Sequence, residues 1–131
     1  MIRQKLIEMG GEFTGSRVYG FPKPDSDYDY VLYDEDGELI EDLMRMGFSA
    51  PSDDEKDSCG ELTDFASLKM QDGEETVNAI VCLRKSFYDE FLEAREHCIK
   101  FAPLRRDDAV EVHQYYLYGG TLDEYYWGEP D

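Results

Sequence analysis

Apolar and polar residues alternate with a helical period in four parts of the chain. Residues 2–9 carry apolar side chains at helical spacing, and the pair Gly10-Gly11 ends that pattern. Residues 34–48 and 86–101 are predicted to be two further amphipathic helices. A last helix is predicted over residues 105–120, ending at Gly119-Gly120.

Two of these helices carry detailed predictions. The inward-facing residues of the 34–48 helix are predicted to be Leu39, Leu43, Met44 and Met46, with Gly47 beyond its end. Ser86 is the predicted N-cap of the 86–101 helix, with Asp89 three residues later as in a capping box. The residues that share one face of that helix are Phe87, Phe91, Ala94, Cys98 and Phe101.

Strand patterns fill the remaining ordered stretches. Residues 12–15 form a short predicted strand that runs into a turn at Gly15, and residues 28–34 form a second strand. Residues 63–71 and 74–83 are predicted to form a hairpin at Asp72-Gly73. Residues 49–61 have no periodicity and are predicted to be a loop. This order predicts one α+β domain over residues 1–131, a small mixed β-sheet with flanking helices placed to one side.

Composition supports a folded chain without a membrane span. The sequence has 131 residues, 41% hydrophobic and 14% aromatic, which suits one domain with one core. No apolar run approaches the length needed to cross a bilayer. The N-terminus lacks the apolar core of a signal peptide, so we expect a cytoplasmic protein. Cys59, Cys82 and Cys98 form no CxxC pair and are expected to be free thiols, the last two in the core.

The balance of charge is strongly acidic. There are 31 acidic and 13 basic residues, giving a formal net charge of −18. Long nucleic acids are therefore unlikely direct ligands, because their binding depends on Lys and Arg displacing counterions. Two interpretations stay open. The charge keeps the protein soluble and does nothing else, or the acidic surface engages a protein partner by imitating a nucleic acid.

The candidate chemistry lies in residues 14–33, TGSRVYGFPKPDSDYDYVLY. Asp27 and Asp29 share one face of the predicted strand and repel each other unless a cation lies between them. Oxygen ligands suit Mg²⁺ or Mn²⁺, which commonly join a phosphate-bearing substrate to carboxylates. Gly15 lets the backbone approach a phosphate, the Ser16 hydroxyl can bind it, and Arg17 adds positive charge. The alternative is a turn followed by an exposed acidic strand end.

Taken together, these residues resemble the DNA polymerase β-type nucleotidyltransferase superfamily. The shared pattern is a Gly-Ser turn, ten intervening residues and Asp-x-Asp on the next strand. The chain looks most like small stand-alone members of the minimal-nucleotidyltransferase type, some of which occur in phages and in toxin–antitoxin modules. The resemblance implies that Asp27 and Asp29 ligate magnesium and that the Gly-Ser turn holds a nucleoside triphosphate. It also implies transfer of the nucleotidyl group to an acceptor hydroxyl.

One position departs from the superfamily pattern. The resemblance implies a third carboxylate on the strand at residues 74–83, and Asn78 stands there instead. An amide oxygen can ligate Mg²⁺, but an amide cannot act as a general base. Glu74 shares the face of Asn78 only four residues away, and Glu75 points to the other face. Two functions are thus expected as alternatives: a Mg²⁺-dependent nucleotidyltransferase, or a catalytically weak, antitoxin-like binding module that engages or inhibits a protein through its acidic surface.

Other polar and aromatic residues are expected to be structural or to contact partners. His97 and His113 are candidates for a general base or a substrate contact, but the favoured prediction is a surface or half-buried residue, because neither belongs to a recognisable motif. The basic pair at 105–106 could reach a phosphate, but pairing with the acidic residues at 107–108 is the favoured interpretation. The aromatic residues at 125–127 are predicted to be exposed and to suit a protein partner.

Overall fold

The computed structural model describes residues 1–49 and 65–119. Helices and strands in these two ranges follow one another as α1 (Ile2–Glu8), β1 (Glu12–Thr14), α2 (Ser16–Tyr19), β2 (Tyr28–Tyr33), α3 (Leu39–Met46), β3 (Phe65–Asp72), β4 (Glu75–Cys82), α4 (Lys85–Lys100) and α5 (Arg106–Tyr118). The strands form one sheet in the order β1-β2-β4-β3, with β2 parallel to β4 and both outer strands antiparallel to their neighbours. The predicted α+β fold with a small mixed sheet is confirmed.

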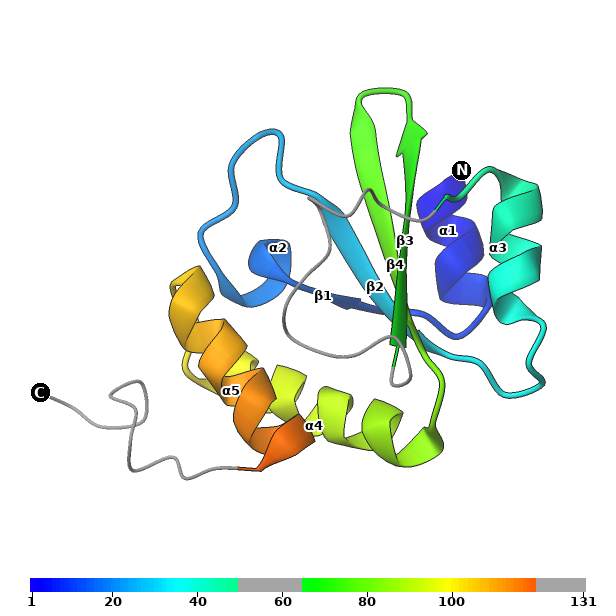
Figure 1. Cartoon of the computed structure of the whole chain (residues 1–131). Coiled ribbons are helices and arrows are strands. Elements are labelled where there is room, and N and C mark those ends of the chain that lie inside the picture. The colour runs from blue at the N-terminus through cyan, green and yellow to red at the C-terminus, as the bar shows by residue number, and fades with distance from the viewer. Residues whose placement is uncertain (50–64, 120–131) are drawn as a thin grey trace, which may run out of the picture.

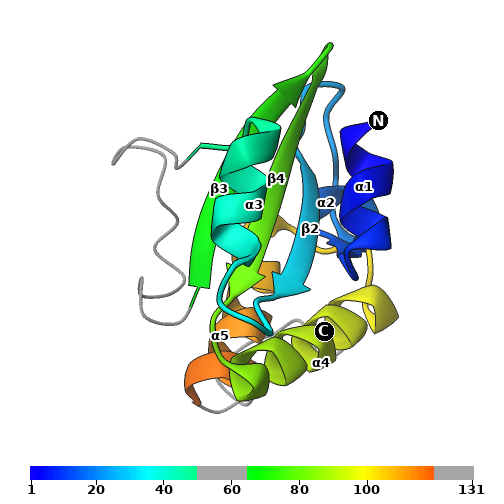
Figure 2. The same ribbon diagram turned by 90° about the vertical axis from the view of Figure 1, so that its right-hand side faces the viewer.

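Helices cover both faces of this sheet, so the prediction that they lie to one side is wrong (Figure 1). In Figure 2, α1 and α3 lie in front of the strands, while α4 crosses below them. The cause is the composition of the two central strands. Both β2 and β4 carry buried apolar residues on each face, and such strands need cover on both sides.

The two faces have different cores, and we call them the back face and the front face. The back face packs against α1 and α3; its buried cluster includes Leu6, Leu43, Tyr30, Leu32, Val77, Ala79 and Val81. The front face packs against α4 through Val31, Cys82, Phe87 and Phe91. A third cluster joins α2, α4 and α5 through Tyr19, Cys98 and Val112.

The helix predicted over residues 34–48 is shorter in the structure. Asp34 accepts hydrogen bonds through Oδ1 from the backbone N–H groups of Gly37 (2.9 Å) and Leu39 (3.2 Å). This side-chain turn replaces the first helical turn, so α3 begins at Leu39. Gly47 ends the helix with φ 115°, as predicted. The inward position predicted for Met44 is wrong, since its side chain is 55% exposed.

The N-terminus of α4 also differs from the prediction. The helix begins at Lys85 with Arg84 as N-cap residue, so Ser86 lies inside the first turn. Asp89 does not close a capping box; its Oδ1 lies 2.8 Å from Lys85 Nζ in an ion pair one turn apart. The predicted apolar face of this helix is confirmed, because Phe87, Phe91, Ala94 and Cys98 are buried.

The last helix and the two core thiols agree with their predictions. The last helix runs to Tyr118 and ends at Gly119, close to its predicted bounds. Cys82 and Cys98 are free and fully buried as predicted, and burial raises the pKa of each thiol to about 12. Cys59 and the aromatic residues 125–127 lie outside the described residues. No helix among the described residues is long and apolar enough to cross a membrane.

Candidate functional site at the polar end of the sheet

Four residues form a row across the front face of the sheet. Thr14 of β1 pairs with Asp29 of β2, which pairs with Asn78 of β4, and Asn78 pairs with Lys69 of β3. Residues directly opposite one another on adjacent strands point to the same face. The register of the sheet therefore gathers a hydroxyl, a carboxylate, an amide and an ammonium group that lie far apart in the sequence.

This row opens into a cleft of about 880 Å³ between the sheet and the helices α2, α4 and α5. Its polar lining includes Gly15, Ser16, Lys23, Ser26, Asp27, Asp29, Ser67, Lys69, Asn78 and Arg106. Its apolar wall includes Phe65, Ile80, Phe87, Phe91, Leu104, Val110 and Leu117. The structure thus brings five of the six predicted site residues into one cleft: Gly15, Ser16, Asp27, Asp29 and Asn78.

Asn78 lies between Asp29 and Ser67 and is hydrogen-bonded to both. Its Nδ2 donates to Asp29 Oδ1 at 3.1 Å, and its Oδ1 accepts from Ser67 Oγ at 2.8 Å. A carboxylate can only accept, so the amide presents its NH₂ group to Asp29. Asn78 therefore orients the carboxylate of Asp29, and its own oxygen is already engaged by Ser67.

Asp27 lies immediately before β2 rather than on it. Its Oδ2 forms an ion pair with Lys69 Nζ at 3.0 Å, and each side chain is about one-third exposed (31% and 32%). Lys69 is a site residue that the sequence interpretation missed. Its ammonium group lies against one of the two carboxylates that were predicted to share a cation.

Gly15 is held against Asp29 by the backbone. Its φ of 85° is unfavourable for any residue with a side chain, and an added Cβ would collide with Asp29 Oδ2. The chain then turns directly into α2, whose first residue is Ser16. A side chain at Gly20 would come within 2.9 Å of Ser16 Cα, so both ends of this short helix need glycine. The Gly-Ser turn is therefore packed against β2, the strand that carries Asp29, as the sequence pattern implies.

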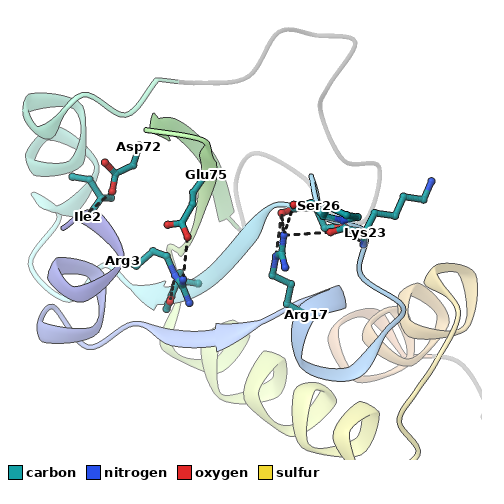
Figure 3. Close-up of polar contacts among 9 residues, drawn as sticks. Ile2, Arg3, Arg17, Lys23, Ser26, Asp72 and Glu75 are labelled. Carbon is teal, nitrogen blue, oxygen red and sulfur yellow. Dashed lines mark hydrogen bonds and ion pairs between the residues drawn. The ribbon is translucent and has the colours of Figure 1, made fainter.

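Arg17 is the one predicted phosphate-binding residue that does not line the cleft. Its guanidinium donates to the carbonyl oxygens of Lys23, Pro24 and Ser26 at 2.9–3.3 Å (Figure 3). It also lies 4.0 Å from the centre of the Tyr28 ring. These contacts fix the loop that carries the chain from α2 to Asp27. Lys23, Lys69 and Arg106 supply the basic groups of the cleft instead.

The two glutamates near Asn78 lie away from the cleft. Glu75 forms an ion pair with Arg3 of α1, with Oε2 and Nη1 3.5 Å apart (Figure 3). Glu74 is exposed in the hairpin turn. Neither glutamate lines the cleft, so neither supplies a carboxylate beside Asn78.

The two histidines differ in position. His113 of α5 is only 7% exposed and lines the cleft, so the prediction of a surface or half-buried residue is wrong for it. Its Nδ1 lies 2.9 Å from the carbonyl oxygen of Ala109, and its ring packs edge-on against Phe91. His97 is half-buried as predicted, with Nδ1 2.8 Å from Tyr116 Oη. Burial, and then Lys100, lower the pKa of His97.

The basic pair before α5 has divided roles. Arg105 lies 3.5 Å from Asp108 in an exposed ion pair, as predicted. Arg106 lines the cleft, which the sequence interpretation did not favour. The difference follows from the backbone, because Arg105 is the extended N-cap residue with ψ 156° and Arg106 is the first residue of α5.

The donor set of the cleft fits a single hard cation. Asp27 and Asp29 offer carboxylate oxygens, and Mg²⁺ commonly binds one or two carboxylates together with substrate phosphates. No group of three or more His, Cys, Asp or Glu residues that could hold a metal occurs among residues 1–49 and 65–119. Two carboxylates would supply only part of the coordination shell of such a cation, and further oxygen ligands would have to complete it.

Comparisons of the chain with known proteins found no match. No family model matches the sequence. No curated protein and no solved structure matches it either.

Proposed function

We propose that the cleft binds a nucleoside triphosphate with one Mg²⁺ or Mn²⁺ ion and that the protein transfers a nucleotidyl group to an acceptor hydroxyl. The acceptor oxygen forms a bond to the α-phosphorus, the bond from that phosphorus to pyrophosphate breaks, and the hydroxyl proton passes to solvent. The observation that carries this proposal is the contact between the Gly-Ser turn and the Asp-x-Asp strand. Gly15 packs directly against the carboxylate of Asp29, and both line the same cleft as Asp27 and Ser16. A glycine turn that brings the backbone beside carboxylates in one cleft suits a metal-bound phosphate.

The charges of the cleft support a phosphate ligand. The net charge of the whole chain is −18, yet Lys23, Lys69 and Arg106 all line this one cleft. Asp27 and Asp29 would hold a divalent cation, which would offset negative charge on the phosphate. Asn78 would hold Asp29 in place through the 3.1 Å hydrogen bond. The apolar wall offers a surface for the less polar part of the ligand.

Transfer of label from nucleotides tests the activity. The purified protein is incubated with α-³²P-labelled ATP, CTP, GTP or UTP, Mn²⁺ or Mg²⁺, and small-molecule, RNA and protein acceptors. We expect labelled product from the native protein and from Asp25→Asn, whose side chain is exposed and outside the cleft lining. Asp29→Asn should abolish the transfer. Equal transfer by Asp29→Asn would contradict the proposal.

A second function, a binding module for a basic partner, is favoured by three observations. Lys69 already offsets the charge of Asp27, and Asn78 replaces the carboxylate that catalysis in the superfamily would use. Acidic residues also crowd the start of α5: partial burial, and then Asp108 and Asp107, raise the pKa of Glu111. Such a surface suits a basic protein groove.

Salt dependence distinguishes this second function from the first. Affinity capture from a native lysate with the whole chain as bait is compared between native protein and Asp29→Asn. A stoichiometric complex that survives Asp29→Asn and dissociates with increasing salt supports the binding module. A complex that is lost in Asp29→Asn, or that salt leaves intact, argues against it.

A further inference from the structure

We infer that Lys69 acts as a built-in counter-ion that a divalent cation must displace from Asp27, and that the displaced ammonium group then binds the ligand phosphate. This inference rests on the proposed function, since it concerns the same cleft. It assigns a specificity-determining role to a residue that the Asp-x-Asp pattern does not include. The observation behind it is the 3.0 Å ion pair between Lys69 Nζ and Asp27 Oδ2.

The position of Lys69 is fixed by the backbone, while its side chain keeps its freedom. Lys69 pairs with Asn78 in the sheet and exchanges two backbone hydrogen bonds with Ser49, at 2.9 and 2.8 Å. Its Cα therefore stays at the edge of the cleft. The four-carbon side chain carries three rotatable donors and can move from one acceptor to another. Both Lys69 and Asp27 are about one-third exposed, so neither is locked in place by packing.

Charge makes the ammonium and a metal ion compete. Asp27 and Asp29 carry two negative charges, and Lys69 offsets one of them. A divalent cation on Asp27 would lie a few ångströms from the ammonium group, and like charges at that distance repel. The metal thus binds more weakly than it would to the two carboxylates alone. Once the cation and a phosphate are present, the phosphate gives the displaced ammonium a new acceptor in the same cleft.

Binding of Mn²⁺ alone, measured by calorimetry in the absence of nucleotide, tests the competition. Lys69→Met removes the charge and keeps most of the length of the side chain. We expect Mn²⁺ to bind this variant at least about threefold more tightly than it binds the native protein, the size expected for a partly exposed ion pair. Lys69→Arg keeps the charge and should bind Mn²⁺ as weakly as the native protein.

A distant lysine serves as the control for net charge. Lys5→Met changes the total charge by the same amount on α1, outside the cleft, and should leave Mn²⁺ affinity unchanged. The second half of the inference is tested with ATP at saturating Mn²⁺, where Lys69 has already left Asp27. ATP should then bind Lys69→Met several-fold more weakly than it binds the native protein, because one phosphate contact is missing.

The outcomes separate failure of the inference from failure of the proposed function. If Asp29→Asn abolishes Mn²⁺ binding but Lys69→Met binds as the native protein does, the counter-ion role is wrong and the metal site stands. Tight binding by both Lys69→Met and Lys69→Arg would also overturn the inference, since charge would not be the cause. Unchanged ATP affinity in Lys69→Met would overturn the phosphate contact. If no protein binds Mn²⁺ through Asp29, the proposed function fails and the inference fails with it.

Discussion

The back face and the front face of the sheet are built from the same strands, yet they serve different purposes. On the back face, every buried position of β2 and β4 is apolar, and α1 and α3 close it with Leu6 and Leu43. On the front face, apolar residues extend only from Val31 and Ile80 onward, and the preceding row holds Asp29, Asn78 and Lys69. The back face is closed by apolar residues throughout, whereas the front face has an apolar core at one end and polar groups lining the cleft at the other. The proposed function therefore depends on where the apolar cover of the front face stops.

The largest expected effect comes from a substitution in the core of the back face. Leu43→Ala removes a fully buried side chain from α3 and should lower the free energy of unfolding by about 2–5 kcal/mol. Urea denaturation followed by circular dichroism measures the change. Met44→Ala on the exposed side of the same helix is the control, with an expected change within about 0.5 kcal/mol. Equal losses in the two variants would contradict the assignment of the back-face core.

The next effect is at the junction between the Gly-Ser turn and Asp29. Gly15→Ala introduces both a strained backbone and a collision with the Asp29 carboxylate. We therefore expect the free energy of unfolding to fall by about 2–4 kcal/mol. Gly37→Ala is a matched control, because Gly37 has a similar φ of 79° with open space around it. The free energy of unfolding of Gly37→Ala should fall by only about 1–2 kcal/mol, because only the backbone is strained. If urea denaturation gives the same loss for both, the turn is not packed against Asp29 as described.

A smaller effect sharpens the role of the polar row. Asn78→Asp places a second carboxylate beside Asp29 and should destabilise the protein by about 1–2 kcal/mol without metal at pH 7. Adding Mn²⁺ should restore more stability to this variant than to the native protein. Thr76→Asp adds the same charge to the same face of β4, two residues earlier, and should show no such recovery. Equal recovery in both variants would argue against a cation site at Asp29.

The smallest expected effect is on the pH dependence of stability. It involves His97, which does not line the cleft. The pKa of His97 is lowered in the folded protein, so the unfolded chain binds a proton more readily. The free energy of unfolding should therefore decrease as pH falls through about 6.5, the ordinary histidine value. In His97→Asn the decrease between pH 7.5 and 5.5 should be smaller, as measured by urea denaturation at each pH. An unchanged pH dependence would show that His97 contributes nothing to it.

The sequence predicted local elements well where a single period decides the structure. The apolar face of α4, the alternation of β2 and the glycine end of α3 all depend on neighbours within a few residues. It also predicted that Gly15, Asp27 and Asp29 would meet, because a turn between adjacent strands brings them together. The helices on both faces were missed, although the apolar run Ala79–Cys82 is typical of a strand that is buried on each side.

Lys69 and Arg17 show why the rest could not be predicted. The hairpin was placed on Asp72-Gly73, which would pair Asn78 with residue 67. The structure instead pairs Asp72 with Glu75, and this register brings Lys69 opposite Asn78. Arg17 was assigned to phosphate from its position beside Ser16, but helix α2 turns it toward the carbonyl oxygens of the following loop. Register and side-chain direction depend on tertiary contacts that spacing along the chain does not contain.

The most direct test of the central claim is the melting temperature of the native protein with a nucleoside triphosphate, with and without Mg²⁺. A ligand that binds only the folded state must raise the melting temperature. We predict a rise that requires both nucleotide and Mg²⁺, that persists in Asp25→Asn and that is absent in Asp29→Asn. No rise with any of the four nucleotides, or an equal rise in Asp29→Asn, would contradict a metal–triphosphate site in this cleft.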